Sequence, residues 1–333
     1  MRRALNPSND RDLNAGRAVI CVLAFIVGGV CLAASLLAQG GQINPWLDLL
    51  THFAPAWLAG ALVAFGCGLS LAKGMARRAL LILGGLGVLA AAVLIAPELT
   101  RTIRPSIKAP AATQIRLIQF NAWEENANPE RAADWIVGQN PDVVTVEELT
   151  PAFQNALVAR GLVFNKGVST TAIFSRGRRG RHPFAVPAGD WKLLPEFARA
   201  SFPAPDGGED FSVVAVHLTW PSLSSQWSQR EVFASLLDLY AKDRLIVAGD
   251  FNLTPWSFAL RRLDERLGLE RRDRAIATWP AMQWIRGRLV MMPAMLPIDH
   301  IYAGSAWRTV RLTRGPRMGS EHYPLVIDLA LAP

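Results

Sequence analysis

The amino-acid sequence predicts an α/β domain preceded by three transmembrane helices. Two observations support this prediction: three long stretches without charged residues lie in the N-terminal third of the chain, and the rest alternates between strand-like and helix-like segments. Hydrophobic residues make up 51% of the 333 residues and charged residues 19%, which is more apolar than an ordinary soluble domain. The excess is concentrated near the N-terminus, so we expect that part to lie in lipid.

The three apolar stretches are residues 18–38, 53–72 and 79–97, each about twenty residues long and free of Asp, Glu, Lys and Arg. A helix of this length crosses a bilayer, whereas a buried helix of a soluble protein normally keeps a polar face. The first stretch could also belong to a cleaved signal peptide, but it is too long for one. Residues 1–97 are therefore predicted to form a membrane region with three transmembrane helices.

Basic residues precede the first span and follow the second, whereas the loop 39–52 between these spans has none. The positive-inside rule then places the N-terminus and the second loop in the cytoplasm. Three crossings put the remaining chain on the other side, so we expect an integral protein of a bacterial inner membrane with a periplasmic or extracellular domain. Basic residues after the third span argue mildly against this. The residues that support the assignment are Arg2, Arg3, Arg11, Arg17, Lys73, Arg77 and Arg78, and those that oppose it are Arg101, Arg104 and Lys108.

The formal net charge of +8 gives little support to a nucleic-acid-binding surface. Ten of the 35 basic residues and four of the 27 acidic residues precede Ala112, so the remainder has a net charge of only +2. Cys21, Cys31 and Cys67 all fall in the apolar stretches. This excludes a disulfide framework or a cysteine zinc site in the soluble part.

Residues 98–112 contain Pro105 and Pro110 among small and basic residues, which is typical of an extended linker. Residues 113–333 suit one large domain of packed sheets with helices on the outer faces, because strand and helix signals alternate along them. The expected strands lie near residues 115–120, 142–146, 162–174 (a pair), 211–217, 245–248, 298–302, 306–312 and 325–330, and the expected helices near 128–137, 151–160, 226–240 and 257–267.

Polar clusters occur where these strands begin or end, which is where α/β folds usually bind ligands. Any one cluster is more commonly a helix cap or a solvated turn. Together they offer several oxygen ligands of the kind that hard divalent cations select, and a histidine beside spare carboxylates. The clusters are Gln119-Phe120-Asn121, Glu147-Glu148, His217, Gly249-Asp250-Phe251-Asn252, Asp299-His300 and Ser320-Glu321-His322.

Two further features have a common structural explanation and a rarer functional one. Arg176 begins a basic loop, residues 176–181, which would normally be a solvated turn but could bind a phosphate of the substrate. Four tryptophans would normally pack in the core but could stack on bases or lie at a lipid surface. They are Trp220, Trp227, Trp279 and Trp284.

In order and spacing, the clusters resemble the motifs of the endonuclease/exonuclease/phosphatase superfamily, which includes DNase I-like nucleases, sphingomyelinases and inositol-polyphosphate 5-phosphatases. The resemblance extends from about Ile115 to Leu331. It implies a four-layered α/β/β/α sandwich of two mixed sheets with the active site at one edge of both. The matching segments are Phe120-Asn121, Pro141–Glu148, Ala172–Arg176, Val214–His217, Gly249–Asn252, Ile298–His300 and Ser320–Pro324.

The resemblance also implies a catalytic Mg²⁺ or Mn²⁺ ion. Glu148 is similar to the principal metal ligand of the family, with Asn121 beside it. The family usually has Asp before its last histidine, whereas this chain has Glu321, whose carboxylate extends about 1.5 Å farther. Because Mg²⁺ tolerates little error in ligand distance, Glu321 would bind through water or favour Mn²⁺ or Ca²⁺. Glu147 stands where Gln is common in the family.

The same resemblance implies roles for five further residues. Asp250 and Asn252 are similar to the pair that positions the attacking water and the phosphate, and His217 to the histidine that contacts the phosphate oxygens. Asp299 is similar to the carboxylate that holds the last histidine, and His322 to that histidine, which acts in acid–base chemistry. Such a set suits phosphoester hydrolysis, which needs an in-line water, neutralised phosphate charge and a stabilised leaving oxygen.

The sequence therefore predicts a membrane-anchored, metal-dependent phosphodiester hydrolase. A nuclease acting on DNA or RNA is the first expectation. A phosphoesterase acting on a phospholipid head group or an inositol phosphate is the alternative, because the chain has a membrane anchor and a domain of low net charge. A non-catalytic binding module that has kept the fold is a third possibility, motivated by Glu321. The lipid bilayer is the expected partner besides the substrate, and no protein partner is indicated.

Overall fold

The computed structural model describes residues 7–181, 194–222 and 225–332. Arg2 and Arg3, which support the expected topology, lie outside these ranges. The chain divides into two compact units. The first consists of Met1–Arg101 with the short segment Trp256–Ala259, and the second of Thr102–Pro255 with Leu260–Pro333.

Three long helices make up most of the first unit: α1 (Pro7–Gln39), α3 (Ala54–Ser70) and α4 (Gly74–Thr100). Each contains a stretch long and apolar enough to cross a membrane, as expected. Small residues let the helices approach closely, since a Cβ at Gly84 would lie 2.6 Å from the backbone nitrogen of Phe65. The loop between α1 and α3 is folded rather than extended, and contains the short helix α2 (Pro45–Asp48) between two 3₁₀ turns, Gly40–Gln42 and Leu49–Phe53.

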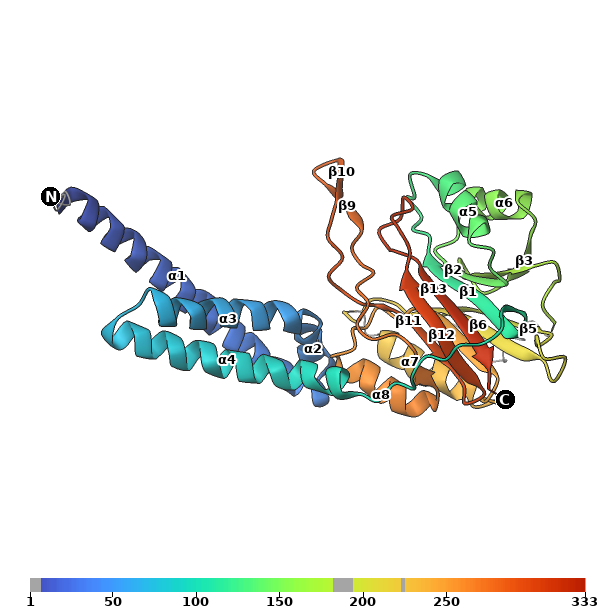
Figure 1. Cartoon of the computed structure of the whole chain (residues 1–333), viewed down its shortest axis with the longest axis horizontal. Helices are drawn as coiled ribbons and strands as arrows, with labels where there is room; N and C mark the ends of the chain where they lie inside the picture. Colours follow the sequence, from blue (N-terminus) through green and yellow to red (C-terminus); the bar gives the residue numbers. More distant parts are fainter. Residues whose placement is uncertain (1–6, 182–193, 223–224, 333) are drawn as a thin grey trace. The chain divides into compact units, whose positions relative to one another are not determined.

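Two mixed sheets pack face to face in the second unit (Figure 1). The six-stranded sheet has the order β12-β13-β1-β2-β4-β3, and the five-stranded sheet the order β5-β6-β7-β11-β8. The strands of the first are β1 (Gln114–Asn121), β2 (Val143–Glu147), β3 (Leu162–Lys166), β4 (Ala172–Arg176), β12 (Trp307–Arg314) and β13 (Leu325–Leu331). Those of the second are β5 (Glu196–Phe202), β6 (Phe211–His217), β7 (Leu245–Asp250), β8 (Glu270–Arg271) and β11 (Asp299–Ala303).

Helices cover the outer faces of both sheets, which confirms the expected four layers. Helices α5 (Pro129–Gly138) and α6 (Pro151–Ala159) pack on the six-stranded sheet, where Phe153 meets Phe120 edge to face. Helices α7 (Ser225–Leu237) and α8 (Phe258–Leu267) lie on the five-stranded sheet (Figure 1). There Tyr302 of β11 donates a 2.6 Å hydrogen bond to Asp264 of α8.

The core between the sheets combines large side chains of the six-stranded sheet with both alanines and large side chains of the five-stranded sheet. Leu117 and Ile173 of the six-stranded sheet share a buried cluster with Ala215 and Ala248 of the five-stranded sheet. Alanines on one inner face let the two sheets approach without leaving voids, because large and small side chains interdigitate. The polar strand ends of the two sheets therefore meet at a common edge.

Strand pairing fixes which residues reach that edge. β1 and β2 are parallel, with Asn121 opposite Glu147, and β6 and β7 are parallel, with His217 opposite Asp250. β11 runs antiparallel to β7, so its first residue, Asp299, also lies opposite Asp250. The carboxyl ends of four strands and the start of a fifth thus converge.

All strands and helices expected from the sequence are present, but the structure adds four strands that we did not expect. These are β5, β8 and the two strands of a separate hairpin, β9 (Met282–Ile285) and β10 (Arg288–Met291). β5 has Glu196 and Arg199 within its seven residues, which weakens its apolar signal. The hairpin has apolar residues on both of its faces, so it shows no simple alternation.

Much of the expected linker is bound to the second unit. The backbone N–H of Arg104 donates to the carboxylate of Glu270 at 2.8 Å, and that of Ile107 donates to the carbonyl of Thr309 at 2.9 Å. Thr309 belongs to β12, the edge strand of the six-stranded sheet. From Arg104 onward the segment therefore follows the sheet edge rather than forming a free tether.

We expect Gly249→Ala to destabilise the second unit. Gly249 precedes Asp250 in β7, and a Cβ there would collide with the carbonyl oxygen of Val216 in β6. The free energy of unfolding should fall by about 1–3 kcal/mol or more. Gly138→Ala, at the end of α5, is the matched control, because a Cβ there meets nothing within 4 Å. Denaturant unfolding of the full chain in detergent compares the two variants, and equal stabilities would contradict the close approach of β6 and β7.

Candidate active site

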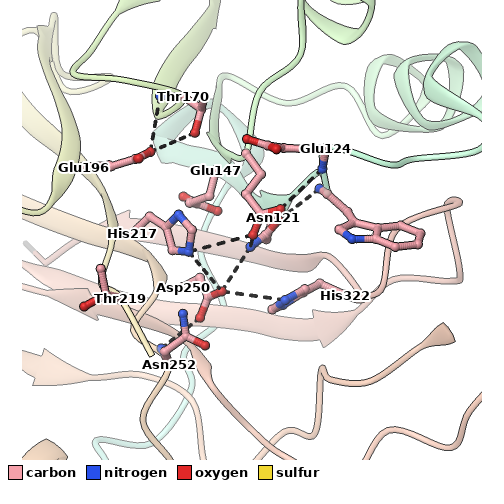
Figure 2. A network of polar contacts seen from close by, with 12 residues as sticks. Asn121, Glu124, Glu147, Thr170, Glu196, His217, Thr219, Asp250, Asn252 and His322 are labelled. Atoms are coloured by element: carbon pink, nitrogen blue, oxygen red, sulfur yellow. Dashed lines mark hydrogen bonds and ion pairs between the residues drawn. The ribbon is translucent and has the colours of Figure 1, made fainter. Parts of the chain in front are cut away.

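The polar strand ends form one cluster at the common edge of the sheets (Figure 2). β1, β6 and β7 each end in a polar residue of the cluster, β11 begins with one, and others lie in the loops after β2 and before β13. Hydrogen bonds, ion-pair distances and electrostatic interactions connect eight of the residues expected from the sequence: Asn121, Glu148, His217, Asp250, Asn252, Asp299, Glu321 and His322.

Asn121 links the carboxylates of the two sheets. Its Nδ2 donates to Oε1 of Glu148 at 2.9 Å and to Oδ2 of Asp250 at 3.0 Å. Its Oδ1 accepts the backbone N–H of Trp123 at 3.0 Å. These contacts position Asn121 between the two carboxylates, and its amide oxygen keeps a second lone pair with which it could bind a metal beside Glu148.

Two residues of the cluster have a left-handed backbone, which L residues rarely adopt. Glu148 and Asn252 each have a φ of 52°, a conformation that costs on the order of 1–3 kcal/mol. At Asn252 the conformation is held by hydrogen bonds, since its N–H donates to Oδ1 of Asp250 at 2.9 Å and its Nδ2 to the carbonyl of Leu218 at 2.8 Å. The turn after β7 is thereby tied to the loop after β6.

Asp299 holds and charges His322. Nδ1 of His322 lies 2.9 Å from Oδ2 of Asp299, and Nε2 lies 3.7 Å from Oδ2 of Asp250. Burial alone would lower the pKa of His322, but the charges of Asp299 and Asp250 raise this pKa to about 10. The imidazole is therefore protonated at neutral pH and donates its Nδ1–H to Asp299.

Asp250 lies between the two histidines of the cluster. Burial raises the pKa of Asp250 to about 6, although the positive charge of His322 opposes this change. Nε2 of His217 lies 3.8 Å from Oδ2 of Asp250 and 3.9 Å from Oε1 of Glu148. The side chain of His217 is 19% exposed, so it can meet both these carboxylates and a ligand from solvent.

Gln119 and Glu147 support the site from inside, a role that we did not assign to Gln119 from the sequence. Nε2 of Gln119 donates to Glu147 at 2.9 Å and to Asp299 at 2.7 Å. Burial, followed by the charge of Asp299, raises the pKa of Glu147 well above its usual value, which favours the neutral acid. Both residues are fully buried, so they position Asp299 without meeting solvent.

The start of β5 adds a second supporting group. Glu196 lies opposite His217 in the β5–β6 pair, and its carboxylate accepts hydrogen bonds from the N–H and hydroxyl of Thr170 (Figure 2). This connection joins the loop before β4 to the strand beside His217. No sequence signal indicated it, because β5 itself was not expected.

Glu321 lies on the side of the site from which the β9–β10 hairpin begins. Burial raises the pKa of Glu321 and the charge of Glu148 adds to this, whereas His322 and a hydrogen bond from Trp279 oppose it. The backbone carbonyl of Glu321 accepts the N–H of Ala281 at 2.6 Å. The side chain of Glu321, longer than the Asp usual in the family, is thus held by the hydrogen bond from Trp279.

The cluster has the donor set of a divalent-cation site. Within the described part of the chain, the basic side chains at ion-pair distance from these carboxylates are His217 and His322, and no Lys or Arg is among them. Ligand atoms of Asp250, Asp299 and His322 lie within 4.8 Å of one another. His322 is charged, and Asp299 is held by Gln119 and His322, so carboxylates at the open side of the cluster are the other candidate ligands beside Asp250. Those are Glu148 and Glu321.

Arg176 does not join the cluster. β4 runs antiparallel to β2 with Ser175 opposite Val143, and the N–H of Arg176 donates to the carbonyl of Asp142 at 3.0 Å. Arg176 therefore lies at the start of β2, and Glu148 follows its far end. Its position does not support the substrate-binding role expected from the sequence.

Comparison with known proteins agrees with this geometry. A model of the Endonuclease/Exonuclease/phosphatase family matches residues 118–322, and no curated protein matches the chain. An endonuclease/exonuclease/phosphatase from Bacteroides vulgatus has 17% identity and a TM-score of 0.55, covering 66% of this chain and 100% of its own.

Two structures from Bacteroides thetaiotaomicron have the same fold. An endonuclease/exonuclease/phosphatase family protein has 15% identity and a TM-score of 0.51, covering 66% of this chain and 99% of its own. A mannosyl-6-phosphatase has 15% identity and a TM-score of 0.50, covering 65% of this chain and 100% of its own. At these identities the likeness concerns the fold alone.

Asp299→Asn should lower the pKa of His322, because a neutral amide does not stabilise the imidazolium. In metal-free wild-type protein, His322 should stay protonated from pH 6 to 8, and it should titrate at lower pH in the variant; histidine ring NMR signals measure this. The stability that comes from the raised pKa is fully present below the ordinary value of 6.5 and is lost as pH rises toward about 10. Titration of His322 near its ordinary value in both proteins would contradict the assignment.

Proposed function

Because this chain belongs to the endonuclease/exonuclease/phosphatase family, we propose that it is a membrane-anchored phosphodiester hydrolase that uses Mg²⁺ or Mn²⁺. Members of the family are phosphoric ester hydrolases, so hydrolysis at phosphorus is the reaction class of the chain. One observation carries the proposal: Asn121 and His217 connect Glu148 to Asp250, which lies beside the Asp299–His322 pair. These residues from distant parts of the sequence make one site.

The proposed cation ligands are Glu148, Asp250 and Glu321. Carboxylate oxygens are the ligands that Mg²⁺ and Mn²⁺ prefer, and the excess negative charge of the cluster favours a divalent ion. Such an ion would neutralise charge on the phosphate and on the leaving oxygen. With Glu321 in place of the family's usual Asp, Mn²⁺ is the alternative to Mg²⁺.

The protein's own groups have different tasks in the proposed reaction. Asp250 is the group suited to position the attacking water beside the cation, and the backbone N–H of Asn252 fixes its carboxylate. His322 is charged at neutral pH, so its Nε2–H can donate to a phosphate oxygen while Asp299 holds Nδ1. His322 is then a cationic donor rather than a base. His217 is placed to contact a second phosphate oxygen.

DNA or RNA is the first candidate substrate, since the family description names endonucleases and exonucleases. The alternative is a phospholipid head group or an inositol phosphate. An exposed apolar hairpin beside Glu321 and the low charge of the domain favour this alternative. The non-catalytic alternative loses its motivation, because Glu321 takes part in the cluster.

The distribution of basic residues supports a bacterial inner-membrane location with the catalytic unit on the periplasmic or outer side. The second unit has no cysteine, which makes a direct test possible. A membrane-impermeant thiol reagent should label Leu239→Cys, an exposed position, in intact cells. Labelling only after the cells are opened would reverse the proposed orientation.

Asp250→Ala and His322→Ala should each reduce kcat on a soluble phosphodiester, such as bis(p-nitrophenyl) phosphate, by about 10²–10⁴-fold. Chelation of divalent ions should abolish activity, and Mg²⁺ or Mn²⁺ should restore it. Arg176→Ala is the matched control and should retain activity, because Arg176 lies away from the site. Unchanged activity in either site variant would refute the mechanism. The same full-length protein, screened against DNA, RNA, phospholipid and phosphoinositide, identifies the substrate class.

Glu321→Asp should change the preference between metals rather than abolish activity. The shorter carboxylate restores the family's usual ligand length, so we expect the ratio of Mg²⁺-supported to Mn²⁺-supported kcat/KM to rise. Isothermal titration of each ion into the chelator-treated protein provides a second measurement. An unchanged ratio, with unchanged affinities, would remove Glu321 from the set of ligands.

A further inference from the structure

The β9–β10 hairpin is a regular element that extends away from the two sheets (Figure 1). Its strands, Met282–Ile285 and Arg288–Met291, are joined by Arg286 and Gly287, with φ values of 50° and 75°. Positive φ at both central residues is what a tight type I′ hairpin turn requires. The chain therefore builds a defined projection here rather than a loose loop.

Both faces of this hairpin carry exposed apolar side chains. Trp284 lies opposite Leu289 and Met291 opposite Met282, so these side chains share one face. The other face carries Ile285 and Val290, opposite Arg288 and Gln283. The exposed fractions are 52% for Trp284, 71% for Met291, 43% for Ile285 and 37% for Val290. Core packing, the default expectation for Trp284, is therefore wrong.

Exposure on both faces limits what could cover the hairpin. A partner protein, or a second copy of this chain, would pack against one face of a two-stranded ribbon and leave the other in water. A lipid surface into which the ribbon is inserted surrounds both faces at once. Burying apolar side chains from both faces is favourable only in the second arrangement.

The charges of the segment also match a lipid surface. Residues 279–298 contain no Asp or Glu, and their two basic residues, Arg286 and Arg288, lie at the tip. Arginine beside tryptophan suits the head-group region, where an apolar stem and a polar or charged end are both accommodated. Anionic head groups would attract the two guanidinium groups.

The proposed membrane anchor and the second unit are close to each other along the chain. Helix α4, long and apolar enough to span a membrane, ends at Thr100. The backbone is bound to the second unit from Arg104 onward. Only a few residues of the chain therefore separate the proposed membrane anchor from the second unit.

We propose that the β9–β10 hairpin inserts into the lipid–water interface, with Trp284, Ile285 and Met291 in contact with lipid and the guanidinium groups of Arg286 and Arg288 reaching back from the tip to the head groups. The base of the hairpin is fixed to the active site, because Ala281 bonds the backbone of Glu321 and Trp279 bonds its side chain. Insertion holds the cation side of the site at the membrane surface, where phosphoesters of lipid head groups lie. This inference rests on the proposed membrane anchoring and not on the proposed hydrolysis.

Site-directed fluorescence tests the insertion, since the protein has only three cysteines, Cys21, Cys31 and Cys67. With these replaced by Ser, Ile285→Cys and Met291→Cys place an environment-sensitive dye on opposite faces of the hairpin. Val158→Cys on α6, 45% exposed, is the matched control. The full-length protein is reconstituted in phosphatidylcholine vesicles containing phosphatidylglycerol and spin-labelled lipid. We expect blue-shifted emission and lipid quenching at 285 and 291, and neither at 158.

Two results would overturn the proposal. Dye at both hairpin positions that behaves like dye at 158 shows that the hairpin stays in water. Shielding at only one of the two positions shows a one-sided contact with a protein or a second copy instead. Flotation of the vesicles reports membrane anchoring, and hydrolysis of a soluble diester reports the fold and the proposed activity, so failure of either is distinguished from failure of insertion.

Discussion

The arrangement of the second unit depends on holding several carboxylates close together in the interior. Glu147, Asp250 and Asp299 are all buried at the ends of neighbouring strands, where burial and the repulsion between negative charges disfavour the ionised form of Glu147 and Asp250. The amides of Gln119 and Asn121 bridge them, and the imidazolium of His322 supplies one positive charge. Once Glu148 and Glu321 are included, the single positive charge of His322 does not neutralise the negative charge of the cluster. A bound divalent ion would supply the missing positive charge. The same charged groups therefore affect both the folding stability of the second unit and the proposed binding of a divalent ion.

Strand pairing and the packing of the two sheets bring these carboxylates together, and neither depends on the residues proposed to act in hydrolysis. Parallel pairing of β1 with β2 and of β6 with β7 brings polar strand ends to the same edge, and alanines between the sheets let the two edges approach. The left-handed turns at Glu148 and Asn252 then bring both side chains into the cluster. Each strained turn keeps its left-handed backbone because the surrounding structure fixes the positions of both of its ends.

Much of the fold and of the site could be predicted because buried strands have a recognisable sequence pattern. β2, β6 and β7 are short, β-branched, apolar runs, and the residues that follow them, such as Glu148, are the motif residues. Three features could not be predicted. Gln119 acts through residues 28 and 180 positions away. The location of Arg176 depends on the direction in which β4 pairs. The charge on His322 depends on how close Asp299 and Asp250 lie to it in the packed structure. The hairpin was missed because apolar residues on both faces hide the alternation by which strands are found.

The segment that follows α4 also has a bearing on how the catalytic unit behaves when isolated. β12 is an edge strand, and an uncovered edge is a template on which another chain can add a strand. Part of that edge is occupied by Ile107, bonded to Thr309. A shortened protein beginning at residue 113 would leave those backbone groups open. Self-association of such a fragment would then reflect where the chain was cut, and not how the intact protein assembles.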